Sequence, residues 1–154
     1  MQCRVILFLS LVSIFPACAE SNFKANESSY EECKSKALYF ECEVNNSTYS
    51  LCGSSVKNLF FWQSKGGAFK KIHSGTMNKE FIFEGYHRFK VTQNGLTFSA
   101  NDVSYELFDY IDEESDPAVR EYGVVMSGAG IEGSQNMYCE GKVTSRLSEL
   151  GVNE

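Results

Sequence analysis

The sequence predicts a mainly β domain, an antiparallel sandwich or barrel held by two disulfides, with a short N-terminal helix and a short C-terminal helical turn. Three observations predict this class: short apolar–polar alternations recur along the chain, turn residues separate them, and cysteines are frequent. The 154 residues suit one domain, and a hydrophobic content of 43% is typical of a globular chain.

Residues 1–19 have the features of a cleaved signal peptide. An early arginine precedes a mostly apolar stretch over residues 5–15, and small side chains precede the expected cleavage site. The stretch is shorter than the roughly 20 residues of a membrane-spanning helix. We therefore expect cleavage near Ala19 and a single secreted β domain over residues 20–154, periplasmic or extracellular. A lipid anchor at Cys18 is the alternative.

Short strands are expected from residue 37 onward, because apolar and polar residues alternate there between turn residues. The expected strands are 37–43, 47–52, 56–62, 68–72, 79–84, 87–92, 96–100, 103–110, 120–127 and 135–140. Asn94-Gly95 is the strongest hairpin signal. Capping boxes that begin at Ser28 and Ser29 predict a helix of two or three turns before the strands, and residues 144–150 are expected to form a helical turn ended by Gly151.

Four cysteines remain after cleavage, and an even number in an oxidising compartment predicts two disulfides with three possible pairings. A hairpin folded about Ser47 sets Cys42 opposite Cys52, which favours a Cys42–Cys52 bridge and leaves Cys33 for Cys139. The spacing leaves the other two pairings open. No pair has the short gap of a zinc knuckle, so we expect no metal and no cofactor.

Acidic residues are concentrated in one segment. The formal net charge is −6, and residues 102–121 alone carry eight acids and one base. A nucleic-acid partner is therefore not expected, and a basic protein is. The predicted docking residues in this segment are Asp109, Asp112, Glu113, Glu114 and Asp116. The run lacks the ligand spacing of a calcium loop, and a solvated loop is the alternative.

A glycine-rich segment forms the second candidate surface, at Ser127, Gly128, Ala129 and Gly130. A phosphate-binding loop requires a following helix, whereas a strand is expected here. The segment is either a flexible hairpin loop or a projection that enters a partner's cleft.

Trp62 lies close in sequence to Phe60, Phe61 and Phe69. These aromatic side chains form either part of the core or an apolar groove for a small ligand. The two histidines accompany no recognisable nucleophile motif, so we expect no catalytic residues.

Several motifs resemble those of small, signal-bearing bacterial proteins of unassigned function, and the likeness spans most of the mature chain. They are the spacing of Cys33, Cys42 and Cys52, the stretch 86–92 followed by 96–99, Tyr105-x2-Phe108-Asp109, and 139–142 with Ser145-x-Leu147. This resemblance implies a periplasmic protein. Residues 127–130 are also similar to the serine- and glycine-containing inhibitory loop of the small β-barrel inhibitors of lysozyme, which implies that this loop contacts an enzyme.

The function expected from these features is that of a non-catalytic periplasmic protein that binds another, basic protein. It is either an inhibitor of a cationic cell-wall hydrolase or an immunity protein against such a toxin. The alternative is a glycan- or lipid-binding module that uses an aromatic pocket around Trp62.

Overall fold

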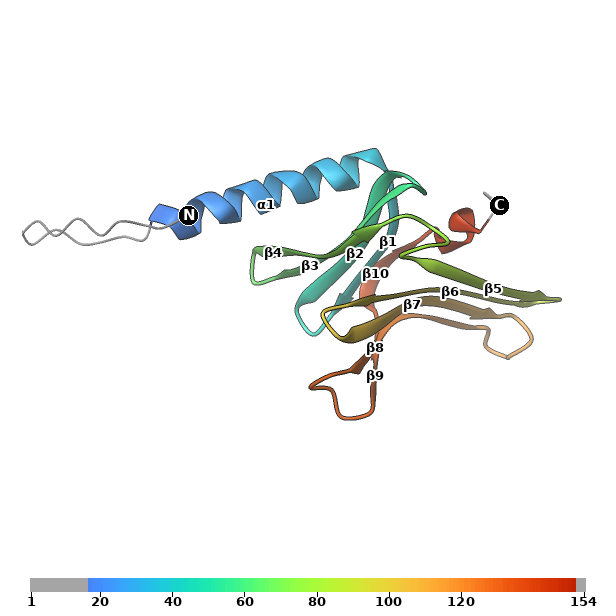
Figure 1. Ribbon diagram of the computed structural model, residues 1–154. Helices are drawn as coiled ribbons and strands as arrows, with labels where there is room; N and C mark the ends of the chain where they lie inside the picture. The colour runs from blue at the N-terminus through green and yellow to red at the C-terminus, as the bar shows by residue number, and fades with distance from the viewer. Residues whose placement is uncertain (1–16, 152–154) are drawn as a thin grey trace, which may run out of the picture.

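The computed structural model describes residues 17–151, which form two five-stranded antiparallel sheets packed face to face, with one helix on the outer face of the first sheet (Figure 1). The mainly β class is confirmed, as a sandwich. The described elements are α1 (Ala17–Lys36), β1 (Leu38–Val44), β2 (Ser47–Ser55), β3 (Asn58–Lys65), β4 (Ala68–Gly75), β5 (Ile82–Arg88), β6 (Val91–Ala100), β7 (Val103–Asp112), β8 (Val119–Gly128), β9 (Ser134–Tyr138), β10 (Glu140–Ser145) and the 3-10 turn η1 (Leu147–Leu150).

Each sheet is a meander, except that β10 returns from the second sheet to the first. The strand orders are β10-β1-β2-β3-β4 and β5-β6-β7-β8-β9. Strands β4 and β5 are consecutive in the chain but lie at edges of different sheets. The described strands pair antiparallel with their neighbours, which fits the alternation of buried and exposed residues in β1 and β3.

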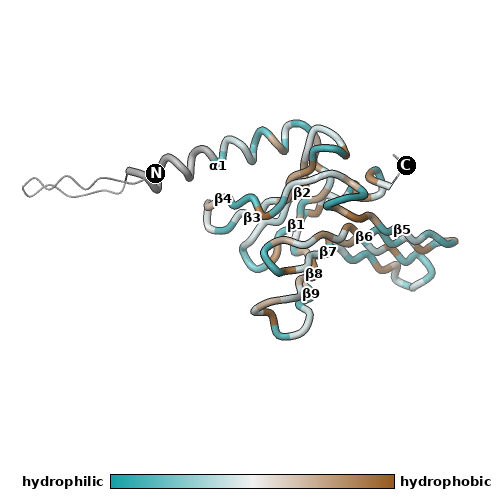
Figure 2. The backbone as a smooth tube through the Cα atoms, viewed as in Figure 1, coloured by the Kyte–Doolittle hydropathy of each residue, from teal (hydrophilic) through white to brown (hydrophobic). Residues whose placement is uncertain are grey.

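Two apolar cores result from this layering. The larger core lies between the sheets and centres on Phe98, whose ring contacts Phe61 and Phe81 at centroid distances of 4.9 Å each. The smaller core lies between α1 and the first sheet and contains Tyr30 and Trp62. In Figure 2 the ends of the β5–β6 hairpin and the β7–β8 loop are largely hydrophilic.

The favoured disulfide pairing is wrong: the bridges are Cys33–Cys52 and Cys42–Cys139. Left-handed residues Asn45 and Asn46 form the β1–β2 turn, so the register places Tyr49, not Cys52, opposite Cys42. Cys42 belongs to the core between the sheets and Cys52 to the core under α1. The two cysteines therefore lie on opposite faces of the first sheet and cannot bond to each other.

The predicted Asn94-Gly95 hairpin is also wrong, because both residues lie inside β6. Asn94 is buried, and its amide donates to the Asp109 carboxylate at 2.6 Å. The chain turns instead at Phe89 and Lys90, where Lys90 adopts a φ of 60°. A buried hydrogen bond to a residue far along the chain outweighs the turn preference of the Asn-Gly pair.

The helical segments differ from the expected lengths. α1 has 20 residues, longer than the two or three turns predicted, and it carries Cys33 as expected. The predicted C-terminal helix begins later, because β10 continues to Ser145 and only η1 is helical.

The signal-peptide prediction falls mostly on residues 1–16, outside the described residues; the expected cleavage near Ala19 falls within α1. No helix in the described part of the chain has the length and apolar character needed to cross a membrane.

Candidate binding sites

The acidic segment spans β7, the β7–β8 loop and the start of β8. Asp112, at the end of β7, organises the loop. The Asp112 carboxylate accepts hydrogen bonds from the backbone N–H groups of Glu114 at 2.8 Å and Ser115 at 3.3 Å, and from the Ser115 hydroxyl at 3.0 Å. The Glu114 N–H contributes most to lowering the pKa of Asp112. The loop is therefore a structured turn that depends on an ionised aspartate.

This loop packs against the turn of the β5–β6 hairpin. The Arg88 guanidinium lies 2.5 Å from the Glu114 carboxylate, and the backbone N–H of Glu113 donates to the Lys90 carbonyl at 2.8 Å. Arg120 lies 3.6 Å from Glu113. The two segments form one end of the second sheet, which we call the distal end and define as residues 84–90 and 112–121. It carries six acidic and three basic side chains.

Large apolar side chains are exposed on this hairpin. Phe89 is 80% exposed, Tyr86 is 53% exposed and Ile82 is 43% exposed. β5 is an edge strand, and in Figure 1 its tip extends to the right beyond the first sheet. The sequence prediction missed this surface because Phe89 was assigned to the middle of a strand; the turn contains no glycine, proline or asparagine that marks it.

Asp109, predicted to be part of the docking surface, is not on the surface. It is 5% exposed and lies between the sheets, where it accepts hydrogen bonds from Asn94 on β6 and from the Ser145 hydroxyl on β10. The alternation of residues along β7 could have predicted this burial, because Leu107 and Asp109 lie on the same, buried face of the strand. Asp109 joins the two sheets and has a structural role.

The glycine-rich segment is the β8–β9 connection. Gly128, Ala129 and Gly130 are exposed and Ser127 is half-buried. The loop is fastened to the β6–β7 turn, because the Ala129 N–H donates to the Asp102 carbonyl at 3.1 Å.

The structure does not bring the two predicted docking surfaces together. In the β7–β8 register Asp112 pairs with Val119 and Val103 pairs with Gly128, so the acidic loop and the glycine-rich loop lie at opposite ends of the sheet. Ten residues of β strand separate them, which corresponds to roughly 30 Å. The acidic loop and the glycine-rich loop therefore cannot belong to one small binding surface.

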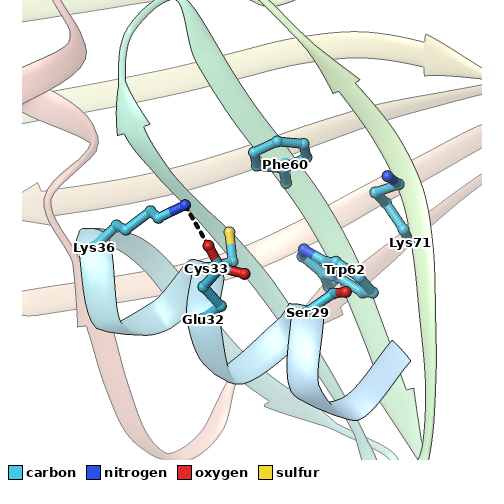
Figure 3. Close-up of a pocket in the computed structure, with 7 residues that line it drawn as sticks. All are labelled: Ser29, Glu32, Cys33, Lys36, Phe60, Trp62 and Lys71. Carbon is cyan, nitrogen blue, oxygen red and sulfur yellow. Dashed lines mark hydrogen bonds and ion pairs between the residues drawn. The ribbon is translucent and has the colours of Figure 1, made fainter. Parts of the chain in front are cut away.

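A third site lies under α1, where a pocket of about 220 Å³ opens between the helix and the outer face of the first sheet (Figure 3). Helix positions one and two turns apart contribute Ser29, Glu32, Cys33 and Lys36, and the sheet contributes Phe60, Trp62 and Lys71. A β-bulge at Ile72 pairs Lys71 with Trp62 while His73 pairs with Phe61, which brings Lys71 to the outer face beside the indole.

The aromatic groove predicted around Trp62 is only partly present. Phe60 and Trp62 line the pocket, whereas Phe61 is fully buried between the sheets and Phe69 packs on Tyr30 at 4.8 Å between ring centroids. Alternation along β3 separates Phe61 from its two neighbours.

The two histidines have different surroundings: the ring of His73 stacks on Phe98, whereas His87 is exposed at the distal end. Among the described residues, no group of three or more His, Cys, Asp or Glu side chains is placed to hold a metal ion. A scan against protein-family models, a search of curated proteins and a search of solved structures found no match for this chain.

Proposed function

We propose that this chain is a non-catalytic binding protein of the periplasm or extracellular space, and that it docks on a basic protein through its distal end. The observation that carries the proposal is the combination of Phe89, 80% exposed, with a structured acidic loop at the same end of the sheet. Exposed aromatic side chains surrounded by charged residues are typical of protein-binding sites.

The distal end supplies both parts of an energetically useful interface. Phe89 and Tyr86 are rigid anchors that bury a large area when a partner covers them. The acids around them attract a basic partner and raise the association rate. The turn built on Asp112 holds the acidic side chains before binding, which lowers the entropy lost on association.

The partner class follows from charge and compartment. Two disulfides fit an oxidising compartment, and a cationic cell-wall hydrolase is a basic protein that acts there. A rigid acidic projection inhibits such an enzyme by covering a basic cleft, which requires no chemistry from the inhibitor. Both a lysozyme inhibitor and an immunity protein against a delivered hydrolase act in this way.

The test measures binding of the oxidised protein to a basic lysozyme by biosensor, with cell-wall lysis assayed in parallel. We expect Phe89→Ala to weaken binding about 30-fold, the effect of losing a hot-spot contact of about 2 kcal/mol. Glu113→Gln combined with Asp116→Asn should slow association and reduce its dependence on salt.

Glu132→Gln is the matched control, because it removes one exposed negative charge from the glycine-rich loop at the opposite end. It should leave affinity unchanged. Weakened binding in this control with intact binding in the Phe89 variant would transfer the docking site to the glycine-rich loop. Absence of binding and inhibition across a panel of basic cell-wall hydrolases would refute the partner class.

A further inference from the structure

The pocket under α1 is independent of the distal end, because it lies on the outer face of the first sheet, while the distal end belongs to the second sheet. Its lining is chemically specific: two aromatic rings from β3, a disulfide cysteine, and two lysines with one glutamate at the rim (Figure 3). The pocket therefore has an apolar interior and a charged entrance.

The clearest sign of a ligand is an unused hydrogen-bond donor in this pocket. Trp62 is 3% exposed, and its indole Nε1 has no partner among the described residues. Figure 3 shows the indole nitrogen on the edge of the ring that faces Cys33 and the helix. Buried polar groups almost always have a partner, and an unpaired one destabilises the fold. A hydrogen-bond acceptor entering here would satisfy this donor.

The rim determines the charge of that acceptor. Lys36 lies 2.8 Å from Glu32, and its hydrogen bond is the main reason that the pKa of Glu32 is lowered. Within the described residues, Lys71 has no carboxylate at ion-pair distance. Its ammonium lies over the rings of Phe60 and Trp62, at 5.4 and 5.9 Å from their centroids. The Lys71 ammonium therefore already occupies the position over the rings that a cationic ligand would take. Because Lys36 is paired with Glu32, the positive charge of Lys71 is left to attract an anionic ligand.

The size of the pocket limits the ligand. A volume of about 220 Å³ is below the roughly 300–1,000 Å³ of sites for drug-sized molecules, but larger than the ~150 Å³ cavity that holds one benzene ring. A sugar stacks on an exposed aromatic face, whereas the Trp62 indole is 3% exposed. A single ring with one small anionic substituent fits these limits better than a glycan or an acyl chain.

We propose that the pocket binds a small aromatic carboxylate, whose carboxylate accepts a hydrogen bond from Trp62 Nε1 and pairs with the Lys71 ammonium while its ring lies against Phe60. Nε1 is screened from water and faces Cys33 and α1, so the ligand reaches it by displacing the exposed Lys71 side chain from the two rings and by moving α1 away from the indole edge. The ammonium then follows the carboxylate, because Lys71 is long and its end is free to move.

The test is an NMR titration of the ¹⁵N-labelled oxidised protein, in which the chain's one tryptophan gives one indole N–H resonance. Benzoate is the probe, with benzyl alcohol and benzylamine as neutral and cationic molecules of similar shape. We expect benzoate to shift the indole resonance saturably at millimolar concentrations, benzyl alcohol to bind at least tenfold more weakly, and benzylamine to cause no shift.

Lys71→Gln should weaken benzoate binding about tenfold, and Lys70→Gln is the matched control because this exposed neighbour on β4 does not line the pocket. Both side chains are exposed, so both variants should fold. An indole resonance unmoved by benzoate, equal binding of benzyl alcohol, or equal weakening by the two substitutions would overturn the proposal. None of these outcomes affects docking through the distal end.

Discussion

Replacing Asp109 by alanine tests whether this acidic residue acts inside the fold and not at the docking surface. The carboxylate accepts two hydrogen bonds, from Asn94 at 2.6 Å and from Ser145, and these join β6, β7 and β10 across the sandwich. In Asp109→Ala the Asn94 amide and the Ser145 hydroxyl lose their acceptor. Asn94 is 3% exposed, so water does not replace the lost bond without disturbing the core.

The magnitude follows from the number of bonds. Hydrogen bonds to charged groups contribute about 1.5–3 kcal/mol each, and removing one partner from a buried charged network costs about 3–5 kcal/mol. We expect Asp109→Ala to lower the free energy of unfolding by about 3–5 kcal/mol, out of a total of roughly 5–15 kcal/mol for a domain. Ser145→Ala removes one bond and should cost about 1.5–3 kcal/mol.

Urea unfolding at neutral pH, with the disulfides oxidised, measures these differences. The double substitution should show a coupling energy of about 1–3 kcal/mol, because both side chains belong to one network. Asp116→Ala, in the exposed loop, is the control and should change stability by less than about 0.5 kcal/mol. A cost below about 1 kcal/mol for Asp109→Ala, together with weakened partner binding, would refute the structural role.

Three further predictions concern other parts of the fold. Replacing Cys33 and Cys52 together by alanine should lower the free energy of unfolding by about 3 kcal/mol, because the bridge closes a loop with a sequence separation of 19; urea unfolding of the double variant against the wild type checks this. Gly128→Ala should cost about 1–3 kcal/mol and lower the thermal midpoint, because φ is +123° and a Cβ would clash with the backbone carbonyl oxygen of Asp102. The contribution of Asp112 is present above its unfolded pKa of about 3.9 and is lost as the pH falls through its lower folded pKa. Protection of the acidic-loop amides from hydrogen exchange, corrected for the intrinsic exchange rate at each pH, should therefore be lost only in strong acid, and a loss of protection between pH 5 and 7 would contradict this.

The alternation of apolar and polar residues predicts most of the strands, because one face of each strand packs against an apolar core. β2 begins at Ser47 and β4 at Ala68, as expected, and the strand expected at 96–100 forms the second half of β6. The strand expected at 87–92 is wrong, because it crosses the turn between β5 and β6. The position of the turn at Phe89 follows from the strand register, in which Val91 of β6 pairs with Arg88 of β5 on one side and with Asp112 of β7 on the other. Such pairing depends on residues far along the chain, which local sequence signals do not report.

The candidate sites show the same limit. Composition predicts the acidic loop, but only the register shows that Asp109 is buried and that the glycine-rich loop lies at the other end of the sheet. The pocket at Trp62 depends on α1 covering β3 and on a bulge in β4. Neither the angle of a helix nor the position of a bulge is determined by spacing alone.

The placement of the β5–β6 tip has a consequence for how such a protein can diversify. His87, Arg88 and Phe89 are all exposed and contribute little to either core. Under the proposed function, substitutions there would change the recognised partner at almost no thermodynamic penalty to the sandwich. If the distal end is the docking surface that we propose, a lineage that meets a changing set of partners would replace its specificity at this hairpin and retain the same scaffold, and exchanging hairpin tips between two such proteins should exchange their partners.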